Sequence, residues 1–124
     1  MSDIIYKDES YVIIGLCMEV YNQLGHGFSE IVYKDAIEFE FNANDIFFER
    51  EKEYLVNYKG NLLSHKFYAD FIVFGEIILE IKSAKEIADE HISQAINYLR
   101  VANKKLALVV NFARGKLQYK RVIY

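Results

Sequence analysis

The run from Leu106 to Phe112 constrains the fold most, because all but one of its residues are apolar. A strand of this composition is typical of a sheet that other elements cover on both faces. A helix is predicted directly before it, over Ala84–Asn103, and a strand before that helix, over Glu76–Lys82. This order favours a crossover between parallel strands, so we expect an α/β fold with helices against a mixed sheet.

Hydrophobic periodicity and turn residues predict the other elements, and the strand at the C-terminal end is expected at an edge of the sheet. These elements are the helices Glu9–Leu24 and Ser29–Phe41 and the strands Ile46–Asn57, Ser64–Phe74 and Leu117–Tyr124. The first helix has an apolar stripe formed by Val12, Ile13, Leu16, Val20 and Leu24. The second has an apolar side formed by Ile31, Ala36, Ile37 and Phe41. Glycine after the first helix relieves the left-handed cap conformation and ends it.

The composition excludes several classes of protein. A length of 124 residues fits one domain, and a hydrophobic share of 52% excludes intrinsic disorder. The single cysteine, Cys17, excludes a disulfide scaffold and a cysteine-based zinc site. No apolar run approaches the roughly 20 residues of a membrane span, and Met1–Ile4 lacks the pattern of a signal peptide. We therefore expect a cytoplasmic protein with no membrane partner.

The net charge of −3 is unevenly distributed along the chain. Residues 1–62 carry 5 Lys/Arg and 12 Asp/Glu, whereas residues 63–124 carry 10 Lys/Arg and 6 Asp/Glu. A basic second half could face phosphates while the acidic half faces water. The simpler interpretation is a scatter of charges over one surface, and both remain open.

The chemistry-bearing residues gather at the predicted hairpin around Gly75. A hairpin centred there places Asp70 directly across from Glu80, with Cβ atoms roughly 5 Å apart, and Lys82 on the same face. The other face is entirely apolar and is expected to be core: Ala69, Phe71, Val73, Ile77, Leu79 and Ile81. Two opposed carboxylates destabilise a hairpin unless a cation compensates. Either Lys82 forms a surface ion-pair cluster with them, or a divalent cation such as Mg²⁺ binds there.

The spacing of Asp70 from Glu80-Ile81-Lys82 resembles the motif of the PD-(D/E)XK nuclease superfamily. The segment Gly27–Tyr33 is similar to the GxxExxY signature that names one family within it. Further blocks similar to that family are Ile13-Ile14-Gly15, Glu19-Val20, Leu24-Gly25, Tyr68-Ala69, His91–Gln94, Asn97–Leu99 and Val110–Phe112. The similarity covers roughly residues 10–124. Three positions depart from the family pattern, and none is a metal ligand by analogy: Tyr21, His26 and Tyr68.

This resemblance implies a restriction-endonuclease-like core of order αβββαβ, with a mixed sheet of four to five strands flanked by helices. It implies metal-dependent hydrolysis of phosphodiester bonds, in which Asp70 and Glu80 hold Mg²⁺ or Mn²⁺ and Glu30 joins them as a third ligand. Lys82 would then act on the attacking water and on the phosphate charge. Without the resemblance, Glu30 is simply a carboxylate stabilised by a helix N-terminus.

The same resemblance implies supporting roles at the site for residues of the predicted helix Ala84–Asn103. Gln94 would order the catalytic site, and Gln94, Tyr98 and His91 would touch substrate, although an ordinary polar helix flank explains them equally. The residues themselves favour packing for Tyr33 and a backbone turn for Gly27.

The expected partner is nucleic acid, with DNA favoured over RNA. A non-catalytic nucleic-acid-binding or assembly module on the same fold is the alternative. A symmetric homodimer would make cutting both strands easier, and the strand Leu117–Tyr124 would offer an edge for it. A monomer is the alternative, because Lys116, Lys120 and Arg121 are the kind of residues that protect an edge strand against pairing.

Overall fold

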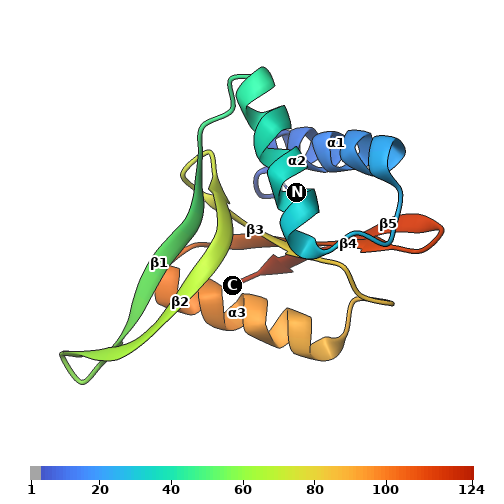
Figure 1. Cartoon of the computed structure of the whole chain (residues 1–124). Helices are drawn as coiled ribbons and strands as arrows, with labels where there is room; N and C mark the ends of the chain where they lie inside the picture. The colour runs from blue at the N-terminus through green and yellow to red at the C-terminus, as the bar shows by residue number, and fades with distance from the viewer. Residues whose placement is uncertain (1–3) are drawn as a thin grey trace.

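The computed structural model describes residues 4–124, so the expectation about a leader at residues 1–3 lies outside the described part. Residues 4–124 form three helices and five strands, and these elements follow one another as shown in Figure 1. They are α1 (Lys7–Leu24), α2 (Glu30–Ala43), β1 (Phe48–Tyr58), β2 (Asn61–Val73), β3 (Ile77–Lys82), α3 (Asp89–Ala102), β4 (Leu106–Ala113) and β5 (Lys116–Ile123).

The five strands form one mixed sheet in the order β1-β2-β3-β4-β5. All neighbouring strands are antiparallel except β3 and β4, which are parallel and are joined by α3. The predicted α/β fold with a mixed sheet and a crossover helix is therefore confirmed. β5 lies at one edge of the sheet, as expected, and β1 lies at the other.

Helices cover both faces of this sheet (Figure 1). On one face, buried side chains of α1 and α2 pack against alternate residues of β2, β3 and β4. On the other face, Ala95 and Leu99 of α3 pack against the strand residues that point to that side of the sheet, such as Ile78 and Val109. Every residue of β4 is buried, which explains why its sequence is almost continuously apolar.

The β2–β3 hairpin has the predicted register. Phe71 pairs with Leu79 and Val73 pairs with Ile77, so their shared face packs against α1 and α2 as expected. Burial specifies this register, because a slip by one residue would turn the whole apolar set to the other face. Ala69 is an exception to the prediction: it packs in the α3-side cluster. The β2–β3 ladder ends at Phe71 and Leu79, so strict alternation does not continue to position 69.

Three other expectations were wrong in detail. Helix α3 begins at Asp89 and not at Ala84, because the side chain of buried Asn111 binds both the N–H and the carbonyl of Ala84 and fixes it in a loop. Ile31 is 54% exposed, and Tyr33 and Lys34 are buried in its place. In α1, Val12 is exposed, while Cys17 lies in the core.

Strand β2 begins at Asn61, three residues before the predicted start, and together with β1 it forms an arm that projects beyond the helices (Figure 1). Its tip turns at Lys59 and Gly60, both with positive φ, as in the type I′ turns that suit the twist of a hairpin. The arm exposes several large apolar side chains: Tyr58, Leu62 and Leu63.

Candidate active site

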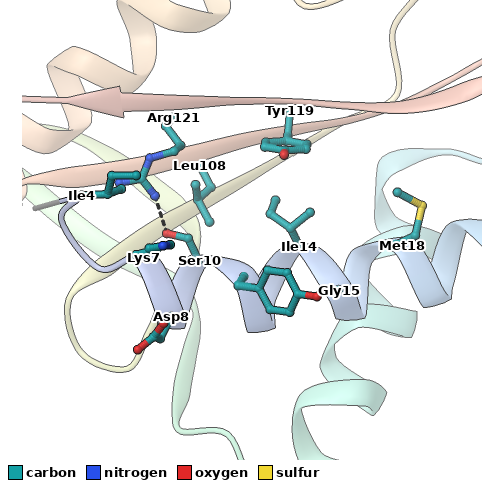
Figure 2. Close-up of a pocket in the computed structure, with 11 residues that line it drawn as sticks. Ile4, Lys7, Asp8, Ser10, Ile14, Gly15, Met18, Leu108, Tyr119 and Arg121 are labelled. Carbon is teal, nitrogen blue, oxygen red and sulfur yellow. Dashed lines mark hydrogen bonds between the residues drawn. The ribbon is translucent and has the colours of Figure 1, made fainter.

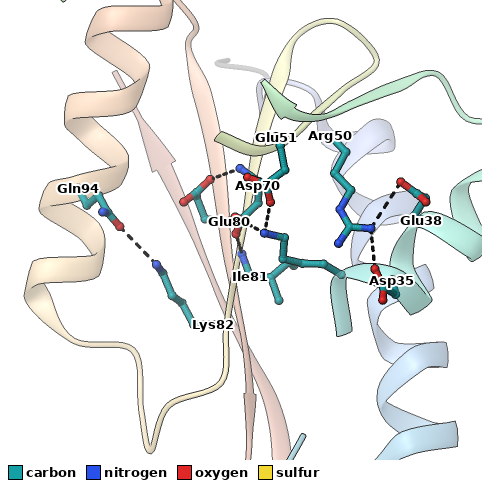
Figure 3. Close-up of polar contacts among 10 residues, drawn as sticks. Asp35, Glu38, Arg50, Glu51, Asp70, Glu80, Ile81, Lys82 and Gln94 are labelled. Atoms are coloured by element: carbon teal, nitrogen blue, oxygen red, sulfur yellow. Dashed lines mark hydrogen bonds and ion pairs between the residues drawn. The ribbon is translucent and has the colours of Figure 1, made fainter. Parts of the chain in front are cut away.

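Asp70 and Glu80 meet where the β2–β3 ladder stops (Figure 3). The Asp70 N–H donates a hydrogen bond to Glu80 Oε2 at 2.8 Å, and the Ile81 N–H donates one to Asp70 Oδ2 at 2.7 Å. Each carboxylate therefore accepts from the backbone of the opposite strand, in place of the next rungs of the sheet. The predicted juxtaposition of the two carboxylates is present in the structure.

Glu80 lies in a strongly perturbed environment. The residue is only 4% exposed, because α3 covers the face that the sequence suggested would be open. Burial, and then the charge of Asp70, raise the pKa of Glu80 from 4.5 to about 8, although Lys82 and Lys34 act in the opposite direction. A buried carboxylate with such a pKa beside a second carboxylate is typical of functional sites.

A third charged group, which the sequence did not point to, completes this cluster. Lys34 of α2 is buried, and its Nζ lies 3.1 Å from Asp70 Oδ1 and contacts Glu51 Oε1 as well. Burial alone would lower the pKa of Lys34, but hydrogen bonds and charges from Glu51 and Asp70 outweigh it and raise that pKa. The ammonium group therefore stays charged between two carboxylates.

Lys82 and Gln94 lie on the α3 side of the cluster. Lys82 Nζ donates a hydrogen bond to Gln94 Oε1 at 3.3 Å, so α3 holds this lysine by its end (Figure 3). The charge of Lys82 also acts on Glu80, since it lowers the pKa of that carboxyl. The predicted neighbours Glu80, Lys82 and Gln94 are thus brought together.

Tyr98 and His91 have different environments. The Tyr98 ring stacks on Phe67 at 4.4 Å, and Phe67 stacks in turn on Tyr54, so three aromatic rings join α3 to the base of the projecting arm. Burial, and then the charges of Glu80 and Asp70, raise the pKa of Tyr98. His91 Nδ1 accepts from the Ala88 N–H and caps α3, a structural role.

Glu30 is exposed in the first turn of α2. Within residues 4–124 no group of three or more His, Cys, Asp or Glu side chains is arranged to hold a metal ion, so Glu30 does not join Asp70 and Glu80 here. The neighbouring motif residue Tyr33 packs, as expected: its ring stacks on Phe112 at 4.0 Å and its hydroxyl bonds the loop before α2. Gly27 in that loop has φ +106°, the turn conformation expected of it.

The donor set at Asp70 and Glu80 fits a hard divalent cation. Mg²⁺ is commonly held by one or two carboxylates together with waters and substrate phosphates, and two carboxylates are present. A separate cavity of about 500 Å³ lies between α1 and strands β4 and β5 and contains none of these residues (Figure 2). Its lining is largely apolar and includes one carboxylate, Asp8, beside the cations Lys7 and Arg121, so it offers no pair of carboxylates for such a cation.

A sequence profile described as the PD-(D/E)XK nuclease superfamily matches residues 7–122. The chain belongs to this superfamily. Enzymes of the PD-(D/E)XK superfamily typically use divalent metals. The five-stranded mixed sheet with flanking helices is consistent with a restriction-endonuclease-like fold.

Comparison with solved structures agrees on the fold. The crystal structure of SSO0001 is similar with a TM-score of 0.60 at 21% identity, and the match covers 74% of this chain. The chain spans about half of that protein, since the match covers 48% of its length. The comparison with curated proteins gave no match. In the part of this PD-(D/E)XK protein that the structure describes, no helix is long and apolar enough to cross a membrane.

Lys34 could have been noticed in the sequence. It lies among the buried residues of α2, next to Tyr33 and three and seven residues before Ile37 and Phe41. A lysine within such a stripe is unusual, because lysine is almost never fully buried unless it is paired. The identity of its partners could not be read, since Glu51 and Asp70 come from other elements.

Proposed function

We propose that this protein is a metal-dependent nuclease that hydrolyses phosphodiester bonds in nucleic acid. The observation that carries the proposal is the pairing of Asp70 and Glu80 at the end of the β2–β3 ladder, with Lys82 beside Glu80. Asp70 and Glu80 would hold Mg²⁺ or Mn²⁺. A divalent cation in such a site offsets charge that develops on the phosphate and lowers the pKa of a bound water.

Lys82 would act on the attacking water and on the charge of the transition state. Its ammonium group carries donors that can bind both a water and a phosphate oxygen. Gln94 accepts one of those donors and thereby sets the direction of the other two. Tyr98, whose pKa the charges of Glu80 and Asp70 help to raise, stacks on Phe67 and so connects α3 to the arm, where a base could stack.

Within the superfamily we assign the chain to the GxxExxY group. Gly27, Glu30 and Tyr33 support this assignment, and Tyr33 holds the loop that carries Gly27. As substrate we favour DNA over RNA. We also propose that the protein acts as a homodimer through β5, which is an edge strand with exposed Tyr119 and Ile123. A monomer in light scattering at tens of micromolar would contradict the dimer.

The test is cleavage of single- and double-stranded DNA and RNA in Mg²⁺, in Mn²⁺ and in EDTA. Lys82→Ala should lower the cleavage rate by about a hundredfold or more, because it removes a donor to the transition state while leaving the carboxylates in place. Lys85→Ala is the matched control, since Lys85 is exposed in the loop after β3. It should cleave at the wild-type rate.

Equal cleavage by wild type and Lys82→Ala would identify a contaminating nuclease and contradict the proposal. The alternative, a nucleic-acid-binding or assembly module without catalysis, would then be tested by fluorescence anisotropy with the same oligonucleotides.

A further inference from the structure

Lys34 has a position that packing does not explain. Its side chain is 11% exposed and reaches from α2 to carboxylates of β1 and β2, and its neighbours along α2 are residues that form the core. An unpaired ammonium group would be costly at this depth, so Lys34 is tolerated there only because it has charged partners. Those partners are two carboxylates on two different strands, Glu51 and Asp70.

The two oxygens of Asp70 have different partners. Oδ2 accepts the Ile81 N–H at 2.7 Å and belongs to the junction of β2 and β3. Oδ1 receives Lys34 Nζ at 3.1 Å. Oδ1 is therefore the oxygen of Asp70 that has no backbone partner, and it is the more accessible of the two oxygens for a cation.

Resting on the proposed function, we propose that Lys34 is a built-in counter-ion that competes with the divalent cation for Asp70 Oδ1. Lys34 Nζ lies between Asp70 Oδ1 and Glu51 Oε1, whereas the metal ion would lie between Asp70 and Glu80, so the two cations share Asp70 and compete for its Oδ1. Lys34 is a positioning residue in this scheme: it neutralises Asp70 until the metal ion displaces it.

Glu51 makes the displacement feasible. Lys34 Nζ contacts Glu51 Oε1 as well, and the Glu51 side chain is 46% exposed. When Lys34 leaves Asp70 it keeps a carboxylate partner that is already partly in water, so its charge is not left buried and unpaired. Asp70 then exchanges Lys34 for the metal ion, and Lys34 stays paired with Glu51 at the rim of the site.

The competition predicts a specific effect on metal affinity. Lys34→Gln removes the charge but keeps a hydrogen-bond donor, and it should tighten Mn²⁺ binding by about tenfold or more, because a nearby positive charge no longer opposes the ion. Lys34→Arg keeps the charge and should bind Mn²⁺ no more tightly than wild type. These affinities are measured by isothermal titration calorimetry with Mn²⁺ alone, without any cleavage assay.

Arg50→Gln is the matched control. Like the Lys34–Glu51 contact, Arg50 joins α2 to β1, since it lies on β1 and pairs with Asp35 and Glu38 of α2, and it too is mostly buried. The substitution removes one positive charge from this interface without touching Asp70. Its Mn²⁺ affinity should stay within about threefold of wild type, since a more distant charge is better screened.

A Lys34→Gln protein that binds Mn²⁺ as weakly as wild type would overturn the inference and leave the proposed function standing. Failure of every variant and of wild type to bind millimolar Mn²⁺ would refute the metal centre itself, and the inference with it. If Lys34→Gln does not fold, the wild type provides the test through acetylation of Lys34, followed by mass spectrometry. Saturating Mn²⁺ should increase labelling of Lys34 relative to Lys59 at the arm tip, and unchanged labelling would overturn the inference.

Discussion

Replacement of Glu80 by Gln should stabilise the fold in metal-free buffer, and more so as the pH rises. Gln is nearly isosteric with Glu, and its side-chain oxygen can still accept the hydrogen bond from the Asp70 N–H. The substitution removes the charge that is held at 4% exposure beside Asp70. At pH 5 the wild-type carboxyl is protonated in the fold, so the two proteins should then have similar free energies of unfolding.

The size and the sign of this change in the free energy of unfolding follow from the pKa of Glu80. Because this pKa is raised from 4.5 to about 8 in the fold, the folded state binds more protons than the unfolded state between these values. Wild-type stability therefore falls as the pH rises through this window, by about 5 kcal/mol at most. Relaxation and water entry around a buried charge reduce such figures, so we expect a gain of about 2 kcal/mol for Glu80→Gln at pH 9.

The assay is urea unfolding in EDTA at pH 5, 7 and 9. The stability difference between Glu80→Gln and wild type should be small at pH 5 and should grow at each step. Glu86→Gln is the control, because Glu86 is exposed in the loop after β3, and its curve should follow wild type. Parallel pH profiles for Glu80→Gln and wild type, or a less stable Gln variant at pH 9, would refute the reasoning.

Two other predictions concern metal binding and the motif tyrosine. Millimolar Mn²⁺ should raise the melting temperature of wild type at pH 8 but not that of Glu80→Gln, as measured by differential scanning calorimetry. Removal of Mn²⁺ with EDTA should reverse the shift. Equal shifts for the two proteins would show that the ion binds elsewhere. Tyr33→Phe should lower the free energy of unfolding by about 1 kcal/mol, because Gly25 O and the Phe28 N–H lose their hydroxyl partner. Cleavage at a temperature where the variant is folded should be unchanged, and a large loss of rate would assign Tyr33 a role beyond packing.

The sequence was sufficient for the central features of the site. The β2–β3 register could be predicted because one face of the hairpin is wholly apolar, so burial leaves a single solution and the opposition of Asp70 and Glu80 follows. The buried strand β4 was evident from its composition for the same reason. These features depend on local alternation, which a sequence displays directly.

Other features depend on contacts between distant segments and could not be predicted. The start of α3 is set by Asn111, a residue of β4 that captures the backbone of Ala84. Resemblance pointed to Glu30 as the residue that α2 contributes to the site, but the helix presents Lys34, one turn later, to Asp70. Which residue of a helix reaches a strand depends on how the helix lies across the sheet, and periodicity does not contain that information.

The Asp70 and Glu80 carboxylates each accept a hydrogen bond from the backbone of the opposite strand, and this affects how homologues should be compared. The two carboxylates hold β2 and β3 together where the ladder ends, so selection for folding alone would preserve acceptors at both positions, even in relatives that had lost catalysis. Lys82 is bound through its end to Gln94 and supports no strand pairing by its side chain. Because Gln at position 80 would accept the same hydrogen bond, an acceptor there marks the fold alone, whereas a carboxylate at position 80 together with lysine at position 82 marks an active nuclease.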